Sequence, residues 1–445
     1  MKVQLFYPRS TIGFGVHNGV YFSLTLLNLA SYVRHKLPDA DIQIFDGNLY
    51  DEEGLIRRLD PKAEIVGISC ESLNYANALK LARKAKDNGS KVVLGGLHAS
   101  YYGEIILRNR PNVDYVVYGK GEEPFFKLLT ENPQKAPNLI WRDDGSIRIN
   151  PPISPVDLDD LEPLEHSLLE LEKYSANHRK VYPEFPDRPL SVASHEGCVK
   201  REAFGPCSFC SLQSRLRFRN PVKFWLAIQN AVSKYEFNLV KDWGDSLTGD
   251  KDYLRRIVET RPSDLEGLVF SVYNSLGEID QETIELLKKL NVRQLFAAVE
   301  SGNNGILKNM NKRVTKEQMK QSIELIGRNN IPLYTSYVLG ERGETVETLE
   351  ETLSFARYIK EVADVRISNG SPIAILPGSP NFERLAKIYP FLKKQDLLDL
   401  KEVRKKWIKY FCPELPDYKV LEQYAEEIGK LGILSNRYGW DPEEK

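Results

Sequence analysis

The sequence has little sulfur and no long apolar run. Cysteine occurs five times in 445 residues and methionine three times. So few cysteines, and an odd number of them, exclude a secreted disulfide framework and favour a reducing cytoplasm. No apolar stretch is long enough to cross a bilayer, and the segment 1–8 has the character of a first strand, not of a signal peptide. We therefore expect a cytoplasmic protein without a membrane span.

An excess of charge of one sign is also missing. The 61 Lys and Arg residues balance 62 Asp and Glu residues, which leaves a net charge of -1. Without a basic run or patch, nothing in the sequence indicates a nucleic-acid partner. Hydrophobic residues make up 42% of the chain, and a chain of this length holds about two to four domains with substantial cores.

Three of the five cysteines lie together, directly after an apolar strand-like run at Leu190–Ser194. They are Cys198, Cys207 and Cys210. Three thiolates can hold three irons of a four-iron, four-sulfur cluster and leave the fourth iron open for a ligand. The same cysteines with His195 would also make a Cys3His zinc site. From these residues alone both sites stay open.

The other two cysteines, Cys70 and Cys412, lie far away in sequence. Cys70 ends the apolar run that starts at Ile65, and we expect it to be a small buried hydrophobe.

Strand-like and helical patterns alternate through the first third of the chain. This order predicts a parallel sheet covered on both faces, whose ligands bind beyond the carboxyl ends of its strands. The expected strands are Val3–Tyr7, Ile42–Phe45, Ile65–Ser69, Val92–Leu94 and Tyr115–Tyr118. The expected helices are Tyr21–Leu37, Tyr75–Asn88 and Glu122–Leu129.

The expected strand ends carry small and polar residues. Gly95 and Gly96 would let a ligand approach the backbone, and Ser69 and Ser72 can hydrogen-bond a phosphate or an amide. The runs Ile44–Gly47, Val66–Ser69, Val92–Ser100 and Val117–Glu122 together resemble the cobalamin-binding domain that precedes some radical S-adenosylmethionine (SAM) domains. The cobalamin contacts that the resemblance implies are Asp46, Ser69, Ser72, Gly95, Gly96, His98 and Gly119.

The same resemblance bears on the lower face of cobalamin. Relatives that ligate cobalt with histidine use Asp-x-His-x-x-Gly, whereas here Asp46 is followed by Gly47 and Asn48. The resemblance therefore implies base-off cobalamin with no histidine lower ligand. His98 belongs to the Gly-Gly motif and is expected either at the nucleotide tail or in the packing of the domain.

A proline-rich connection follows, with a hairpin expected at Asn138–Ile149 around the Asp144–Gly145 turn. From Pro189 onward six strand–helix units predict a partial (β/α)6 barrel with its site at the carboxyl ends of the strands. The expected strands are Leu190–Ser194, Leu239–Trp243, Leu268–Tyr273, Gln294–Val299, Leu333–Leu339 and Val365–Ile375. The expected helices are Val222–Glu236, Lys251–Glu259, Gln281–Leu290, Lys316–Asn329 and Val346–Val362.

Residues 189–380 resemble the radical SAM family in several motifs. An aromatic residue stands between the last two cysteines, acidic residues end the second strand, and glycine turns follow the fifth and sixth strands. The matching segments are Cys207–Cys210, Asp242–Ser246, Val299–Gly302, Tyr337–Thr345 and Leu376–Pro380. The first cysteine gap departs from the usual Cys-x3-Cys-x2-Cys, because eight residues separate Cys198 from Cys207.

The resemblance implies roles for individual residues. The three cysteines would hold the cluster, whose free iron chelates SAM, and reduction would release a 5′-deoxyadenosyl radical. Phe209 is implied at the adenine, Glu300 and Ser301 at the ribose or methionine end of SAM, and Asp245 at SAM or substrate.

The sequence thus predicts an α/β fold in four parts. They are a doubly wound, Rossmann-like cobalamin-binding domain at 1–135, a linker with a hairpin at 136–188, the partial barrel at 189–380 and a helical C-terminal region at 381–445. In the last part we expect helices at Phe391–Ile408 and Val420–Gly432. The basic face around Lys405, near Trp407, is either a solvated surface or a lid for an acidic or peptide substrate.

The activity implied is cobalamin-dependent radical SAM methylation of an unactivated carbon. Two alternatives keep the folds: a cobalamin-containing enzyme that rearranges or cyclises its substrate, and a radical SAM enzyme whose first domain is only a scaffold. A zinc-stabilised binding protein is the non-enzyme alternative. The expected partners are an electron donor such as flavodoxin or ferredoxin and a small-molecule, lipid or peptide substrate.

Overall fold

The computed structural model describes residues 1–10, 19–161, 163–277 and 279–433. The chain packs into two compact units. The first comprises Met1–Ser191 and, from much later in the chain, Tyr389–Leu398; the second comprises Val192–Ile388 and Asp399–Lys445. The four-part division drawn from the sequence stays a prediction, and it did not include the return of Tyr389–Leu398 to the first unit.

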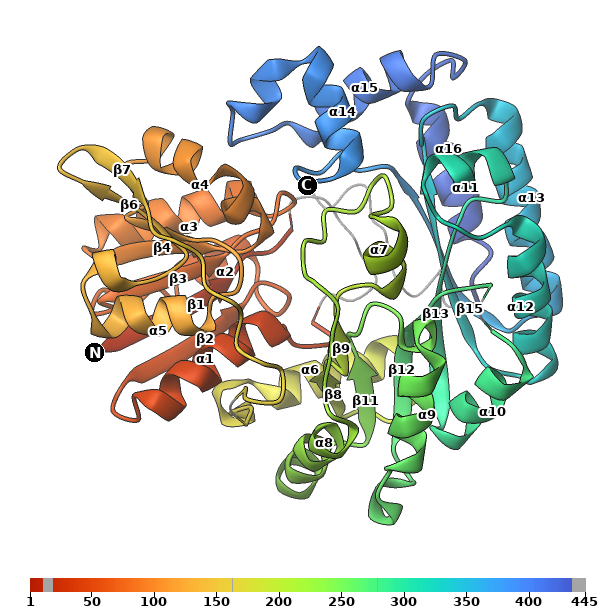
Figure 1. The fold of residues 1–445 in the computed structure, drawn as a ribbon, viewed down its shortest axis with the longest axis horizontal. Helices are drawn as coiled ribbons and strands as arrows, with labels where there is room; N and C mark the ends of the chain where they lie inside the picture. Colours follow the sequence, from red (N-terminus) through yellow and green to blue (C-terminus); the bar gives the residue numbers. More distant parts are fainter. Residues whose placement is uncertain (11–18, 162, 278, 434–445) are drawn as a thin grey trace. The chain divides into compact units, whose positions relative to one another are not determined.

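The first unit is built on a seven-stranded sheet of order β2-β1-β3-β4-β5-β6-β7 (Figure 1). The printed pairs from β2 to β5 are parallel, β6 is antiparallel to β5, and β7 is antiparallel to β6. The strand order reverses at β1, the kind of point at which doubly wound sheets bind ligands. The strands are β1 Lys2–Tyr7, β2 Asp41–Asp46, β3 Ile65–Ser69, β4 Lys91–Gly95, β5 Tyr115–Val117, β6 Leu139–Asp143 and β7 Ser146–Ile149.

Helices cover both faces of this sheet, with α1 and α5 on one side and α2, α3 and α4 on the other (Figure 1). Helix α3 shows why: its alanines and leucine at 78, 81, 82 and 85 recur at helical spacing and are all buried. The helices are α1 Leu24–Lys36, α2 Glu52–Ile56, α3 Tyr75–Asp87, α4 Leu97–Asn109, α5 Glu122–Thr130 and α6 Leu171–Val181. The doubly wound fold is thereby confirmed.

The predicted hairpin is present as β6 and β7. Asp144 and Gly145 both have positive φ, at 45° and 79°, as a two-residue hairpin turn of this kind requires. Three helices of this unit had no counterpart in the sequence prediction, the short α2 among them. Helix α4 begins at Leu97, inside what the sequence indicated as a loop, and α6 lies in the proline-rich connection.

The second unit is built on a six-stranded sheet of order β15-β14-β13-β12-β11-β8, which follows the chain order of its strands. Its printed strand pairs are parallel, as in the predicted partial barrel. The strands are β8 Pro189–Val192, β11 Leu239–Asp242, β12 Val269–Asn274, β13 Val292–Glu300, β14 Leu333–Leu339 and β15 Val365–Pro372. Two short strands, β9 His195–Glu196 and β10 Arg217–Phe218, pair separately.

Capped helices follow these strands (Figure 1). They are α8 Pro221–Tyr235, α9 Lys251–Glu259, α10 Gln281–Lys289, α11 Asn304–Asn309, α12 Lys316–Arg328 and α13 Val346–Val362. All but the short α11 correspond to predicted helices. Thr315 and Thr345 form capping boxes at the starts of α12 and α13. A further short helix, α7 Val199–Phe204, lies between the first two cysteines.

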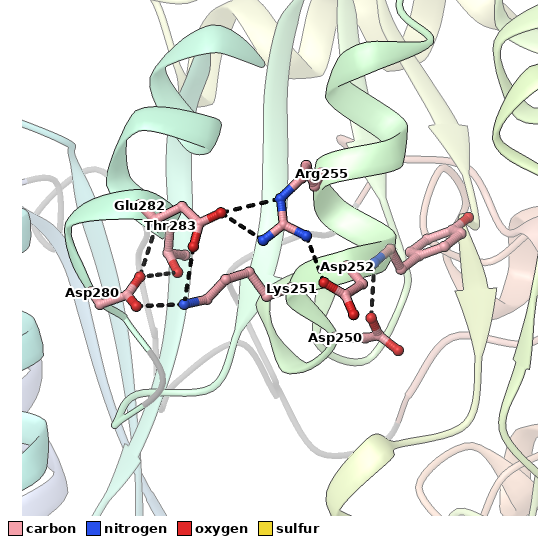
Figure 2. A network of polar contacts seen from close by, with 8 residues as sticks. Asp250, Lys251, Asp252, Arg255, Asp280, Glu282 and Thr283 are labelled. Atoms are coloured by element: carbon pink, nitrogen blue, oxygen red, sulfur yellow. Dashed lines mark hydrogen bonds and ion pairs between the residues drawn. The ribbon is translucent and has the colours of Figure 1, made fainter.

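Figure 2 shows an ionic network that joins the first turns of α9 and α10. Asp250 and Asp280 cap the two helices, Lys251 pairs with Asp280, and Arg255 donates to Glu282 at 2.6 Å. Lys251 lowers the pKa of Asp280 to about 2. Because these side chains are partly exposed, each pair contributes little alone, and the network serves to keep the two helix starts in register.

The C-terminal region is helical in part: α14 Pro380–Ile388, α15 Leu400–Phe411 and α16 Lys419–Gly429. The predicted helix Phe391–Ile408 is wrong over its first half, which has one 3-10 turn at Pro390–Lys393 and no helix again until Leu400. The helix breaks there because the first unit binds this segment through the buried carboxylate of Asp396. No helix of the described residues has the length and apolar character that a membrane crossing needs.

Candidate active site

The cysteine loop begins two residues into the connection after β9. Cys198 is the N-cap of α7, Gly205 ends that helix with φ of 80°, and Cys207 and Cys210 follow in a turn. The eight-residue gap is therefore a single short helix inserted between the first and second thiols. All three cysteines are free and partly buried.

The three sulfur atoms lie near one another. The charges of Cys198 and Cys210 each act to raise the pKa of Cys207, although burial is the larger cause. Even so, the described residues contain no group of three or more His, Cys, Asp or Glu side chains tight enough for one metal ion. A single zinc ion draws its ligands to about 2.3 Å from one centre, whereas a cluster is held through three separate irons. Three thiolates are a donor set that fits an iron–sulfur cluster with one open iron.

His195, the fourth ligand of the zinc alternative, is already engaged. Its Nδ1 lies 2.9 Å from Ser194 Oγ, and its Nε2 accepts the Ser246 N–H at 3.2 Å. Since Nε2 accepts, the ring proton is on Nδ1 and is donated to Ser194 Oγ, which in turn donates to Asp242 at 2.6 Å. The ring is buried. This chain of bonds fixes the residues before the cysteine loop and removes His195 from the possible metal ligands.

Glu300 ends β13 in an unusual conformation. Its φ is +64°, a left-handed value that costs a non-glycine residue energy and is retained mainly at functional sites. Lys312 donates to its Oε1 at 3.1 Å, while its Oε2 is buried without a protein hydrogen-bond partner. A buried carboxylate oxygen without a donor is costly. The arrangement fits a ligand that brings its own donor, such as the ammonium or ribose hydroxyl group of SAM.

The other three implied SAM contacts differ in their surroundings. Ser301 is buried, its Oγ lies 3.1 Å from Thr352 Oγ1, and it accepts the Asn303 N–H, so its hydroxyl holds the turn after β13. Asp245 is exposed on the loop after β11, and its charge acts to raise the pKa of Cys210. Phe209 is partly buried between two cysteines. The SAM contacts of all these residues remain predictions.

In the first unit, Gly95 and Gly96 end β4 next to the end of β3. A Cβ on Gly96, whose φ is +92°, would lie 2.5 Å from the carbonyl oxygen of Cys70, so this glycine is required by the fold. A Cβ on Gly95 would meet nothing nearer than Val117 O at 3.8 Å. The fold does not use the space beside Gly95, which fits a ligand that approaches the backbone. Cys70 is buried as predicted.

The side chains of two implied cobalamin contacts, Asp46 and His98, are buried and hydrogen-bonded within the protein, and a third implied contact, Ser72, is a partner of His98. The buried Asp46 carboxylate accepts the Tyr174 hydroxyl at 2.7 Å and the Asn48 N–H at 2.8 Å, and burial raises its pKa. His98 is buried, with Nδ1 2.9 Å from Ser72 Oγ and Nε2 2.9 Å from the Asp396 carbonyl oxygen. Both residues stabilise the unit, and their contact with cobalamin stays a prediction.

Ser69 and Gly119 lie at the ends of β3 and β5. Ser69 is partly buried, and Gly119 has φ of 74° and donates its N–H to Ser100 Oγ at 3.0 Å. Both stay predicted contacts.

Sequence reasoning missed the residues that anchor the cysteine loop. Ser208 lies between two cysteines, and Glu341 stands in the turn after β14 that the sequence had already singled out. Burial raises the pKa of Glu341, and Ser208 donates to it at 2.5 Å. The available signal was the acidic residue in an otherwise glycine-rich turn.

Two family comparisons match these two units. The B12-binding domain family matches residues 14–129, and the radical SAM superfamily matches residues 193–356. An uncharacterised methyltransferase of Pyrococcus horikoshii is 24% identical over 428 residues, which are 92% of this chain and 85% of that protein.

Two further proteins match a smaller share of their own length. An anaerobic magnesium-protoporphyrin IX monomethyl ester cyclase of Rubrivivax gelatinosus is 28% identical over 318 residues, which are 66% of this chain and 54% of that protein. The solved structure of the cobalamin-dependent SAM radical enzyme OxsB, with aqua-cobalamin and SAM bound, has a TM-score of 0.66 and 17% identity. It covers 87% of this chain and 60% of its own. At that identity the likeness shows the fold alone.

The two matched domains define the class: a cobalamin-binding radical SAM enzyme. The chain belongs to the radical SAM enzymes that carry a B12-binding domain ahead of the barrel. The cofactors of this class are a four-iron, four-sulfur cluster, SAM and cobalamin.

Proposed function

We propose that this chain methylates an unactivated carbon of its substrate with cobalamin and SAM. What supports this is a relative named as a methyltransferase, whose match covers 92% of the chain across both units. The electron donor, such as a flavodoxin or ferredoxin, and the substrate, a small molecule, lipid or peptide, belong to the proposal. So does base-off cobalamin, since neither of the two residues after Asp46 is a histidine.

The residues of the second unit have separate tasks in this proposal. Cys198, Cys207 and Cys210 hold the cluster, and Glu300 accepts a hydrogen bond from SAM with the oxygen that has no protein donor. Lys312 orients that carboxylate, because its ammonium lies 3.1 Å from the other oxygen. Phe209 would pack on the adenine, and Asp245 would face SAM or substrate.

The first unit supplies a cradle. The open space beside Gly95 takes the cofactor tail, and the glycine-rich ends of β4 and β5 let the tail approach the backbone. When bound, the cluster supplies the electron that cleaves SAM, and cobalamin supplies the methyl group.

The second candidate is a cobalamin-containing enzyme that cyclises or rearranges its substrate without methyl transfer. The cyclase of Rubrivivax gelatinosus, matched over two thirds of this chain, favours it. The mass of the product separates the two: methylation with SAM that carries a trideuterated methyl group adds about 17 mass units to the substrate, whereas cyclisation adds none.

The cofactors are tested first. Anaerobic purification with cobalamin supplied, followed by iron, sulfide, cobalt and zinc analysis, should give iron with labile sulfide and one corrinoid per chain. A Cys198/Cys207/Cys210→Ala triple variant should lose the iron and keep the corrinoid. Iron without corrinoid would contradict methylation, and zinc in place of iron would contradict the whole proposal.

A further inference from the structure

Ser208, between the second and third cysteines, is held at all of its polar groups. Its N–H donates to the carbonyl oxygen of Met310 at 2.9 Å, and its own carbonyl oxygen accepts the Asn381 N–H at 2.8 Å. Its hydroxyl donates to Glu341 Oε2 at 2.5 Å. Ser208 is 5% exposed. Three segments, from the end of α11, the turn after β14 and the start of α14, thus meet on one residue of the cysteine loop.

The carboxylate that receives the hydroxyl is buried and fully used. Glu341 is 0% exposed. Its Oε2 also accepts the Asn381 side-chain amide at 2.8 Å, and its Oε1 accepts the Arg342 N–H at 2.8 Å. A buried carboxylate that loses a donor keeps its desolvation cost. The bond to Ser208 is therefore one that the folded unit strongly retains.

The turn that carries Glu341 is itself fixed from the other side. Trp407 Nε1 donates to the carbonyl oxygen of Gly340 at 2.8 Å, and the Cys412 thiol lies 3.0 Å from the carbonyl oxygen of Glu341. The Gly343 N–H donates to Phe411 O at 2.7 Å. Helix α15 thus holds the turn in one place, so Glu341 is a rigid anchor and not a mobile side chain.

From these contacts we infer that Ser208 and Glu341 are positioning residues for the cluster. They hold the turn Cys207–Cys210 in the ligating conformation before any iron binds. The thiols therefore need little reorganisation to bind the cluster, and the bound cluster is released slowly. This rests on the proposed use of the loop to hold a cluster, and not on which reaction the enzyme performs.

The test compares variants that remove one hydrogen bond each. Ser208→Ala deletes the hydroxyl and keeps both backbone bonds. Glu341→Gln keeps the shape, but either orientation of the amide turns its NH2 toward a donor. Ser211→Ala, also in the loop and partly buried, and Glu414→Gln, which is exposed, are the matched controls. All proteins are reconstituted anaerobically as full chains.

Iron release to an excess of a chelator is the first measurement. We expect release from Ser208→Ala and from Glu341→Gln to be about tenfold faster than from the unmodified protein, which corresponds to about 1.4 kcal/mol. Iron release from the double variant should be about as fast as from either single variant, because the two substitutions remove the same interaction. The two controls should stay within about twofold of the unmodified protein.

A second measurement needs no cluster. In the apo-proteins, hydrogen exchange of the Cys207–Cys210 amides should speed up in Ser208→Ala while exchange in α12 and α13 stays unchanged. Iron release unchanged in both variants would overturn the inference, and so would faster exchange throughout the unit, because that would show a general loss of stability. If the unmodified protein assembles no cluster, it is the proposed function that fails.

Discussion

The segment Tyr389–Leu398 should detach from the first unit when the carboxylate of Asp396 is removed. Asp396 is 1% exposed and accepts three hydrogen bonds, from Arg110 Nε at 2.7 Å, Tyr75 OH at 2.7 Å and Asn109 Nδ2 at 3.1 Å. Burial acts to raise its pKa, but Arg110 and the two other donors lower the pKa below its ordinary value. The carboxylate is therefore charged at neutral pH and holds the segment.

The size of the effect follows from what Asp396→Ala leaves behind. Tyr75 is 1% exposed, so its hydroxyl would be buried without an acceptor, which costs about 1–3 kcal/mol. Arg110 would lose its counter-ion, but its side chain is 29% exposed and water replaces much of that interaction. We expect a total of about 3 kcal/mol in the free energy of opening the segment, which is about a hundredfold in the open population.

Limited digestion with trypsin measures that population. Lys393 and Lys394 lie within the segment, and cleavage there tracks the open form when reclosing is fast. Asp396→Ala should be cut about a hundredfold faster at these lysines, and the exposed Glu414→Ala should be cut at the unmodified rate. An Asp396→Ala cleavage rate within threefold of the unmodified protein would refute the role of the carboxylate.

Three further predictions concern the buried groups of the two units. Burial raises the pKa of Glu344 to about 7, so its stabilising contribution is full below pH 4.5 and is lost as pH rises through 7. In urea unfolding, the free energy of unfolding of Glu344→Gln should therefore depend less on pH between these values than that of the unmodified protein. Burial lowers the pKa of Lys241, so the stability of the unmodified protein relative to Lys241→Met should rise with pH toward 10.5, and a flat difference would contradict this. Gly96→Ala should lower the melting temperature more than Gly89→Ala, because their φ values are 92° and 91° but only Gly96 faces a backbone atom, Cys70 O at 2.5 Å.

The strands and most helices could be predicted because each repeats a local pattern. Ile65–Ser69 and Leu333–Leu339 have the predicted bounds, since a buried parallel strand is a continuous apolar run. Helix α6 was missed because it has no clear apolar pattern. Its buried residues, Tyr174, Ser175 and His178, are mostly polar, and prolines precede and follow the helix in the chain. Their burial depends on tertiary contacts, because the Tyr174 hydroxyl donates a hydrogen bond to the carboxylate of Asp46.

The sequence indicated the candidate site residues that belong to a local motif. It did not indicate the residues whose hydrogen-bond partners lie far away in the chain. The three cysteines lie close together in the chain, at positions 198, 207 and 210, and could be recognised by their spacing. Ser208 and Glu341 are 133 positions apart, and no local pattern connects them. His98 was expected either at the nucleotide tail or in the packing of the domain. Its ring bonds to the carbonyl oxygen of Asp396, 298 positions away, a partner that its motif did not indicate.

The buried carboxylates of the described residues differ in how many of their oxygens have a hydrogen-bond donor in the protein. Six described Asp and Glu side chains are buried. Five of them use both oxygens as acceptors for protein donors and so stabilise loops or segments. These five are Asp46, Asp242, Glu341, Glu344 and Asp396.

Glu300 is the exception among these six, because its Oε2 has no hydrogen-bond partner in the protein. It is also the only one of the six with a positive φ. A fold that provides two or more donors to every other buried carboxylate has the means to provide a second donor here. The unpartnered oxygen and the strained backbone have one common explanation if a ligand completes the site. Among the buried acids of the barrel, Glu300 is therefore the one that we propose as a ligand contact.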